Sequence, residues 1–417
     1  MRKTWLLVPL SALLLFTPGS AQNPPQPITP VKGVGPADTI GKPRDGSKLP
    51  AAAQPIYYSA HRGMDWLKLA NKPDGRFVYG FLPCLRAPMD GDNFLSQAGA
   101  AFALARATRY FRDERGAAIA RQAILTLLLE TAVDAKDPTI RYTAPPPQAV
   151  NRLASHGFLI LAVHELAAPG KDLLDQADQL CSYLRKLQRE DGALMSHEGE
   201  DPKKAVMTEM DAQCAGIALH ALVRSHKHRP AEWKLDMVRK ARVYYHACWQ
   251  ANKNIATVVT HAPAYAEAYV VTKEQAFAEA VFALNDWLIG LQYREESELT
   301  RKHWVGGFPR SADGRAESAV PDIWSALPGE SLAEACRVAK HAGDLPRGQR
   351  YERALTLNLH FLMSLQYAPV RVQHFVEPFR PAILGGFHGS HQDGNLRIDF
   401  TQHPLCAMVQ YLEGVIE

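Results

Sequence analysis

Acidic, imidazole and phenolic side chains recur where several alanine-rich, apolar segments of this sequence begin. Such groups are the usual proton donors and acceptors in enzymes. The residues whose types and positions could carry out chemistry are Asp211, Glu330, His261, Tyr265, His403 and Asp399. Asp399 precedes His403 by four residues, or one helical turn, so we expect its carboxylate to orient the imidazole.

A pair of carboxylates would suit the hydrolysis of a glycosidic bond. That reaction needs a protonated acid and a second carboxylate on the other side of the sugar. Asp211 and Glu330 begin different apolar segments, so they could face each other across a shared site. The remaining carboxylates near such starts are Glu209, Glu334 and Asp399.

The same inventory also suits a lyase or an epimerase that acts on a uronic acid. This chemistry needs a base for the C5 proton and a cation beside the carboxylate. His261, Tyr265 or His403 could supply the base, and Arg152 could supply the cation. The sequence does not choose between this reaction and hydrolysis.

Other residues near the segment starts could bind a substrate without taking part in the reaction. Aromatic rings can stack on sugars, although loop aromatics also pack their own loops. Asp, Asn and Thr at helix starts commonly cap the helix, and a histidine in an apolar helix is commonly a satisfied core residue. The expected binding residues are Arg152, Gln97, His156, Glu209, Gln402, Trp304 and Phe308.

Two kinds of helical segment alternate along the chain and would position these residues. Amphipathic segments place apolar residues three and four positions apart, which predicts helices with one buried face; they cover 52–71, 113–132, 171–188, 231–250, 274–292 and 347–366. Segments that are small or apolar on all sides predict helices buried on both sides; they cover 94–110, 148–166, 211–222, 261–270, 329–340 and 398–416. Six alternations predict an all-α fold with an outer ring of helices around an inner ring.

A degenerate repeat marks the ends of the amphipathic segments. Leu187-Gln188 is followed by Asp191-Gly192, Leu291-Gln292 by Gly306-Gly307-Phe308, and Leu365-Gln366 by Gly385-Gly386-Phe387. Repetition of helix pairs is typical of helical arrays and rings. These repeats resemble those of the terpenoid-cyclase and prenyltransferase toroids. The helix alternation also resembles six-hairpin glycosidases and related lyases and epimerases, which implies an (α/α)6 toroid over residues 52–417.

The repeated loops indicate where a site should lie. Each loop joins the end of an outer helix to the start of an inner helix, so all of these loops should lie at one end of the ring. The inner helices present their free N–H groups and positive dipole ends there. We therefore expect a concave, polar ligand site at that end.

Two alternatives to a carbohydrate enzyme stay open. Asp90-Gly91-Asp92-Asn93 is similar to the aspartate-rich protonation motif of squalene-type cyclases, but Asn93 replaces an acid at its last position. A cyclase would have a closed apolar cavity into which Asp90 and Asp92 point. A non-catalytic toroid that binds a carbohydrate or a protein is the other alternative.

The first residues predict export. Met1-Arg2-Lys3 precedes an apolar run from Trp5 to Phe16 that ends in small residues before Ala21, as in a signal peptide of residues 1–21. Residues 22–51 are rich in Pro and Gly and read as a linker. We expect a periplasmic or secreted protein without a stable membrane anchor after cleavage.

The remaining composition narrows the function further. The formal charge is +4, which leaves no basic footprint for nucleic acid. The sequence has no phosphate-binding GxxxxGK or GxGxxG motif and no HExxH zinc motif, so we expect no cofactor and no metal. Together these observations predict an exported enzyme that acts on a poly- or oligosaccharide, as a hydrolase or as a lyase or epimerase.

Overall fold

The computed structural model describes residues 41–145, 150–196, 208–295, 301–311 and 319–416. These residues belong to one compact unit, which spans Ile40–Glu417. The expected signal peptide, residues 1–21, and residues 22–40 of the expected linker lie outside the described residues. No described helix combines the length and the apolar character needed to cross a membrane.

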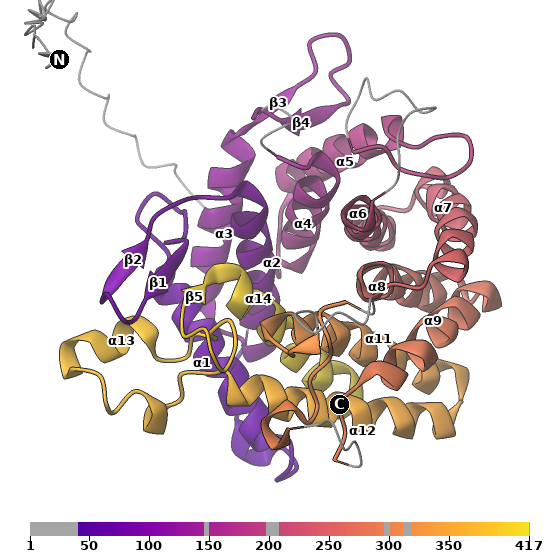
Figure 1. Cartoon of the computed structure of the whole chain (residues 1–417). Helices are drawn as coiled ribbons and strands as arrows, with labels where there is room; N and C mark the ends of the chain where they lie inside the picture. The colour runs from indigo at the N-terminus through magenta and orange to yellow at the C-terminus, as the bar shows by residue number, and fades with distance from the viewer. Residues whose placement is uncertain (1–40, 146–149, 197–207, 296–300, 312–318, 417) are drawn as a thin grey trace, which may run out of the picture. The chain divides into compact units, whose positions relative to one another are not determined.

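Twelve long helices make up the described unit, and they alternate between an outer and an inner ring (Figure 1). The outer helices are α1 (Gln54–Ala70), α3 (Glu114–Leu129), α5 (Lys171–Lys186), α7 (Glu232–Ala251), α9 (Gln275–Leu288) and α12 (Leu345–Ser364). The inner helices are α2 (Phe94–Phe111), α4 (Arg152–Glu165), α6 (Glu209–His228), α8 (Ile255–Thr272), α11 (Ala326–Ala342) and α14 (Ile398–Tyr411). Each inner helix packs against the next, and α14 packs against α2, so the ring closes. The predicted (α/α)6 toroid is confirmed.

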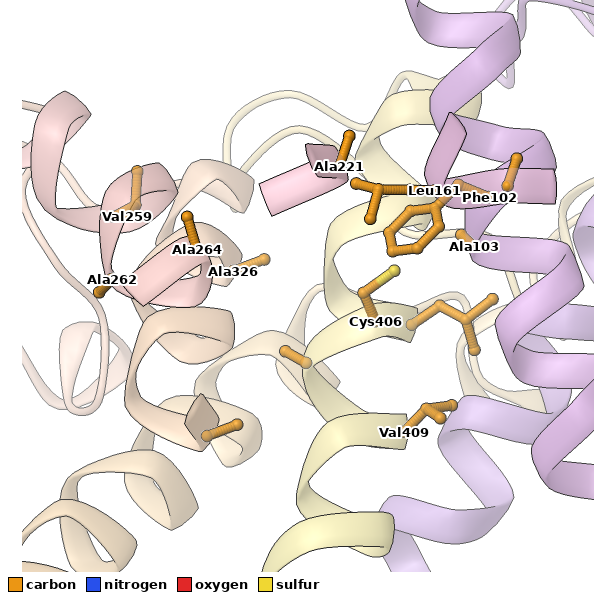
Figure 2. Close-up of a cluster of buried hydrophobic side chains, with 14 of the residues drawn as sticks. Phe102, Ala103, Leu161, Ala221, Val259, Ala262, Ala264, Ala326, Cys406 and Val409 are labelled. Carbon is orange, nitrogen blue, oxygen red and sulfur yellow. The ribbon is translucent and has the colours of Figure 1, made fainter. Parts of the chain in front are cut away.

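The inner helices are buried because they carry small apolar side chains on nearly every side. In α2, only Leu95 and Arg109 escape full burial. Alanine lets neighbouring helices approach closely without leaving voids between them. Figure 2 shows apolar side chains of this core, including Phe102, Leu161 and Cys406, which come from α2, α4 and α14.

Short strands join distant parts of the ring. Strand β1 (Gly80–Leu82) pairs antiparallel with both β2 (Ala87–Met89) and β5 (Leu396–Arg397). Because β5 runs directly into α14, this sheet connects the first hairpin of the ring to the last helix. Strands β3 (Thr131–Val133) and β4 (Arg141–Thr143) form a separate hairpin between α3 and α4.

Short helical turns occupy the loops and both ends of the described chain. The first, η1, packs on α1, where the hydroxyl of Tyr57 donates a hydrogen bond of 2.7 Å to the carbonyl of Arg44. Residues 41–51, which the sequence assigns to the linker, therefore include a segment packed on the ring. The short helices are η1 (Gly46–Lys48), η2 (Ile289–Leu291), η3 (Lys302–Trp304), η4 (Ile323–Ser325), η5 (Pro369–Arg371), η6 (Glu377–Phe379), α13 (Arg380–Ile383) and the π-turn η7 (Leu412–Ile416).

Three repeated glutamines tie an outer helix to the next outer helix, at α5–α7, α9–α12 and α12–α1. The side-chain amide of Gln188 donates to the carbonyls of Gly192 and Met237 (3.3 and 2.8 Å). Gln292 does the same with Gly306 and Ala354, and Gln366 with Gly385 and Ser59. One carbonyl in each set lies in the turn and the other lies in α7, α12 or α1. The Gln366 amide closes the ring, because it joins α12 to α1.

The glycine in each of these turns allows the close approach. Gly192, Gly306 and Gly385 have φ values of +97°, +88° and +91°, which only glycine adopts without strain. A Cβ atom at Gly385 would lie 2.3 Å from the carbonyl oxygen of Arg62, in the backbone of α1. The Asp-Gly and Gly-Gly-Phe repeats are therefore sites of backbone contact between successive hairpins.

We predict that Gly385→Ala lowers the free energy of unfolding by about 2 kcal/mol or more, since backbone strain and a backbone clash act together. Gly343→Ala is the matched control. Gly343 also has a positive φ, +73°, but no atom lies within 4 Å of its added Cβ. Chemical denaturation measures the free energy of unfolding of both variants. The loss in Gly343→Ala reports backbone strain alone, and the additional loss in Gly385→Ala reports the clash. Equal losses in the two variants would contradict the role of the close approach.

Candidate functional site

A cavity of about 510 Å³ lies inside the ring of inner helices. All six inner helices line it, together with the loop and turn that precede α11. On α6, the lining residues run from Glu209 to His220, eleven positions along the helix. At 1.5 Å per residue, the cavity is therefore ~16 Å deep.

The cavity changes character along its depth. Polar residues line the mouth, where the inner helices begin; they include Glu209, Gln213, Arg310, Glu330, Gln402 and His403. Apolar residues line the middle; they include Phe102, Phe158, Leu161, Ile217, Val259 and Pro263. His220 and Gln410 return polar groups to the wall at the far end, which we call the floor.

The structure brings two of the predicted site residues into direct contact at the mouth. The Nδ1 atom of His403 lies 2.7 Å from Oε1 of Glu330, between α14 and α11. The two side chains are 12% and 14% exposed, and both line the cavity. A carboxylate accepts hydrogen bonds, so Nδ1 carries the proton and Nε2 of the neutral ring keeps its lone pair. Nε2 has no hydrogen-bond partner among the described residues.

An aromatic ring lies beside this histidine. The ring of Trp324, in η4, has its centroid 5.8 Å from that of His403, and both residues line the cavity. The sequence predicts Trp304 and Phe308 as the stacking residues of this region. Trp304 instead packs against Tyr293 at 5.3 Å, and Phe308 is 1% exposed; neither lines the cavity.

The structure corrects the role expected for Asp399. Its carboxylate accepts a hydrogen bond of 2.9 Å from Nε of Arg397, a second one from the same guanidinium, and one of 3.1 Å from the backbone N–H of Phe400. Asp399 lines the mouth, but it pairs with Arg397 and stabilises the start of α14. The imidazole of His403 is oriented by Glu330 of the neighbouring helix instead.

The structure does not bring Asp211 opposite Glu330. The Asp211 carboxylate accepts from the hydroxyl (2.7 Å) and the backbone N–H (3.1 Å) of Thr208, which makes a capping box at the start of α6. The hydroxyl of Ser196 also donates to it. Asp211 does not line the cavity, and Glu330 is already paired with His403.

His261 and Tyr265 lie away from the cavity because they are on a different face of α8 from the residues that line it, which include Val259, Thr260 and Pro263. The sequence predicts this helix over 261–270, but Asn254 caps it and the helix starts at Ile255. His261 is fully buried; Nδ1 lies 3.1 Å from the hydroxyl of Tyr265, and Nε2 lies 2.8 Å from a backbone carbonyl of α6. Burial lowers the pKa of His261 to about 4 and raises the pKa of Tyr265. Neither residue lines the cavity.

Arg152 and His156 hold the β3–β4 hairpin on α4. The Arg152 guanidinium donates to the hydroxyl of Tyr183 (3.0 Å) and to the carbonyl of Thr143 (3.2 Å), and it stacks on Tyr142. Nε2 of His156 accepts from the N–H of Thr143 at 3.0 Å. Burial lowers the pKa of His156 to about 3, so its ring stays neutral. Neither side chain lines the cavity, so the structure gives Arg152 no access to a substrate carboxylate there.

Of the remaining predicted binding residues, one has a structural role and two line the cavity. Gln97 is buried and pairs with both backbone groups of Phe77 (2.8 and 2.9 Å), so it positions a loop. Glu209 and Gln402 line the mouth. Gln402 fits over Gly99, where a Cβ atom would lie 2.0 Å from its Oε1.

The aspartates of the cyclase-like motif lie outside the cavity. Asp92 accepts from the guanidinium of Arg76 at 2.6 Å and from the amide of Gln97 at 2.9 Å. Asp90 is exposed, and neither aspartate lines the cavity. The structure therefore does not place this motif where it could protonate a ligand inside the ring.

The polar residues of the floor, His220 and Gln410, lie far from the helix starts, where the sequence predicts the site, so they are not among the predicted site residues. A signal was present in α6. Glu209, Gln213, Ile217 and His220 follow one another at spacings of four, four and three, which places all of them on one helix face. Among the described residues, no group of three His, Cys, Asp or Glu side chains is arranged to hold a metal ion.

Comparisons with known proteins identify the fold. No protein-family model and no curated protein matches the chain. A sugar epimerase from a ruminal bacterium is similar with a TM-score of 0.61 at 12% identity, over 86% of this chain and 98% of that one. An alpha-1,6-mannanase from Salegentibacter sp. HEL1_6, also solved with alpha-1,6-mannotriose, has a TM-score of 0.59 at 10% identity, over 87% and 100% of the two chains.

A third similar structure belongs to a different enzyme class. The type II terpene cyclase MstE from Scytonema has a TM-score of 0.52 at 12% identity, over 86% of this chain and 98% of that one. At these identities the likeness establishes the α/α toroid. It confirms the predicted resemblance to six-hairpin carbohydrate enzymes and terpenoid cyclases at the level of the fold.

The buried histidines predict a stability that depends on pH. Burial holds the pKa of His261 at about 4, whereas the unfolded ring has a pKa of 6.5. Below pH 6.5 the unfolded chain takes up a proton that the folded chain refuses, so the free energy of unfolding falls as the pH decreases toward 4. The loss approaches about 1.4 kcal/mol per pH unit for each such histidine.

We expect urea denaturation of His261→Gln at pH 7 and pH 5 to show a smaller loss between the two pH values than the parent chain shows. His360→Gln is the control, because His360 is exposed on α12. An identical pH slope in the parent and in His261→Gln would contradict the burial argument.

Proposed function

We propose that this protein is an exported carbohydrate-active enzyme in which His403 transfers a proton to or from the substrate. The observation that carries the proposal is the hydrogen bond between His403 and Glu330 at the mouth of a cavity large enough for a small ligand. The reaction classes that use such a base on a sugar are epimerisation, isomerisation and β-elimination. Export is inferred from the first residues of the sequence.

The contact with Glu330 suits His403 to act as a base. The carboxylate fixes the ring so that Nδ1 carries the proton, and Nε2 is left as the basic atom. When Nε2 takes a proton, the nearby carboxylate stabilises the imidazolium that forms. The ring of Trp324 beside His403 offers an apolar surface against which the face of a sugar could pack.

The geometry supports proton transfer at carbon better than hydrolysis. Hydrolysis requires two carboxylates on opposite sides of the bond that breaks. Asp211 is occupied in a capping box away from the cavity, Glu330 is paired with His403, and Asp399 is paired with Arg397. Glu209 is the one lining carboxylate without a described charged partner, so the cavity lacks a matched pair among the described residues.

The apolar middle of the cavity favours one second candidate, an enzyme that acts on an isoprenoid. Phe102, Phe158 and Val259 would suit a hydrocarbon chain. The position of Asp92 argues against this candidate, because its carboxylate is held by Arg76 outside the cavity. The carbohydrate proposal accounts for the polar mouth as well, and we prefer it.

The proposal is tested with residues 22–417 and a panel of neutral and uronate-containing sugars. Chromatography would detect epimers and isomers, and absorbance would detect unsaturated products. We expect turnover that His403→Gln lowers by about 100-fold or more. Glu330→Gln should lower it less, because an amide still orients the ring but stabilises the imidazolium poorly.

Two controls make the test specific. His360→Gln removes an exposed histidine of α12 and should retain full turnover. Asp211→Asn should also retain turnover, apart from the effect of a weaker helix cap on stability. Full turnover in His403→Gln, or loss of turnover in Asp211→Asn with the fold intact, would overturn the assignment of the base.

A further inference from the structure

The floor of the cavity carries two buried polar side chains that the proposed proton transfer does not use. Nε2 of His220 lies 2.9 Å from Oε2 of Glu267, in α8. The amide nitrogen of Gln410 donates a hydrogen bond of 3.2 Å to Oε1 of Glu334, in α11. His220 is 8% exposed and Gln410 is 5% exposed, and both line the cavity.

The orientation of Gln410 leaves an acceptor without a partner. Only the NH2 end of the amide can face the carboxylate of Glu334, so Oε1 must face away from it. Oε1 is buried and has no hydrogen-bond partner among the described residues. A buried acceptor in that state is costly, so a group that donates a hydrogen bond would be stabilised there.

His220 offers a second acceptor of the same kind. Its Nε2 faces the carboxylate of Glu267, so in the neutral tautomer of the ring Nε2 is the nitrogen that carries the proton. Nδ1 then keeps a lone pair, and it has no hydrogen-bond partner among the described residues. Two acceptors at one end of a cavity suit a ligand that brings hydroxyl donors, and they do not suit a carboxylate or a phosphate, which bring only acceptors.

The charges behind the floor are balanced. Arg224 donates to Glu267 at 2.6 Å and also to Glu165, and Arg337 donates to Glu334 at 2.8 Å. Arg224 and His220 hold the pKa of Glu267 well below its usual value, so this carboxylate is ionised. The cluster contains four guanidinium groups and four carboxylates, which are Arg106, Arg109, Arg224, Arg337, Glu165, Glu267, Glu334 and Glu413.

We infer that the floor is a subsite for the neutral, hydroxyl-bearing end of the substrate, which donates to Oε1 of Gln410 and to Nδ1 of His220. This inference rests on the proposed function for the statement that the substrate is a sugar. Gln410 follows His403 by seven residues on α14, so the floor lies ~10 Å beyond the base. The substrate therefore reacts at the mouth while its far end is recognised at the floor.

The inference is tested by binding, separately from turnover. The probes are D-mannose, alpha-1,6-mannobiose, D-glucosamine and D-glucuronate, and calorimetry measures their dissociation constants. We expect at least one neutral probe to bind the parent chain more tightly than glucuronate and glucosamine. Gln410→Leu should raise the dissociation constant of that neutral probe by about tenfold, which corresponds to one lost hydrogen bond. His403→Gln should retain binding and lose turnover.

Each outcome decides a different claim. Equal binding by Gln410→Leu and the parent chain, with turnover intact, overturns the subsite and leaves the proposed function standing. Tighter binding of glucuronate or glucosamine overturns the neutral character of the floor. Absence of both binding and turnover for all probes overturns the subsite together with the proposed function. The thermal unfolding midpoint of Gln410→Leu, if close to that of the parent, excludes misfolding as the cause.

Discussion

The toroid depends on one repeated interaction between a glutamine amide, a turn and the next outer helix. In each of three turns, the amide donates to the carbonyl of a glycine with positive φ and to a backbone carbonyl of the following outer helix. Gln366 makes this contact across the closure of the ring, between α12 and α1. The glycine lets the turn touch that helix directly, so the turns fix the spacing of successive hairpins.

The spacing of the hairpins determines what the inner helices bring together. The contact between His403 and Glu330 exists because α14 and α11 are neighbours in the closed ring, although 73 residues separate the two side chains in sequence. The same pair of helices supports Gln410 on Glu334 near the floor. A single helix interface therefore carries both the proposed base and one wall of the proposed subsite.

Much of the fold could be predicted from the sequence, but less of the site. Period and composition predicted every long helix, because burial on one side or on both sides is visible in the pattern of small and apolar residues. Helix starts were harder to place. Asn254 caps α8, which starts at Ile255, six residues before the expected segment 261–270, and His261 lies on a face of this helix that packs in the core. The partner of His403 could not be predicted, because it comes from another helix and not from Asp399 one turn away.

The most direct test of the account is the incorporation of deuterium from D2O into the sugar during turnover. If His403 takes and returns a proton at carbon, mass spectrometry should detect one carbon-bound deuteron in the product of an epimerisation or isomerisation, and His403→Gln should abolish its incorporation. A β-elimination should instead release an unsaturated product, also dependent on His403. Saturated products with new reducing ends and no carbon-bound deuterium would show hydrolysis and would contradict the account.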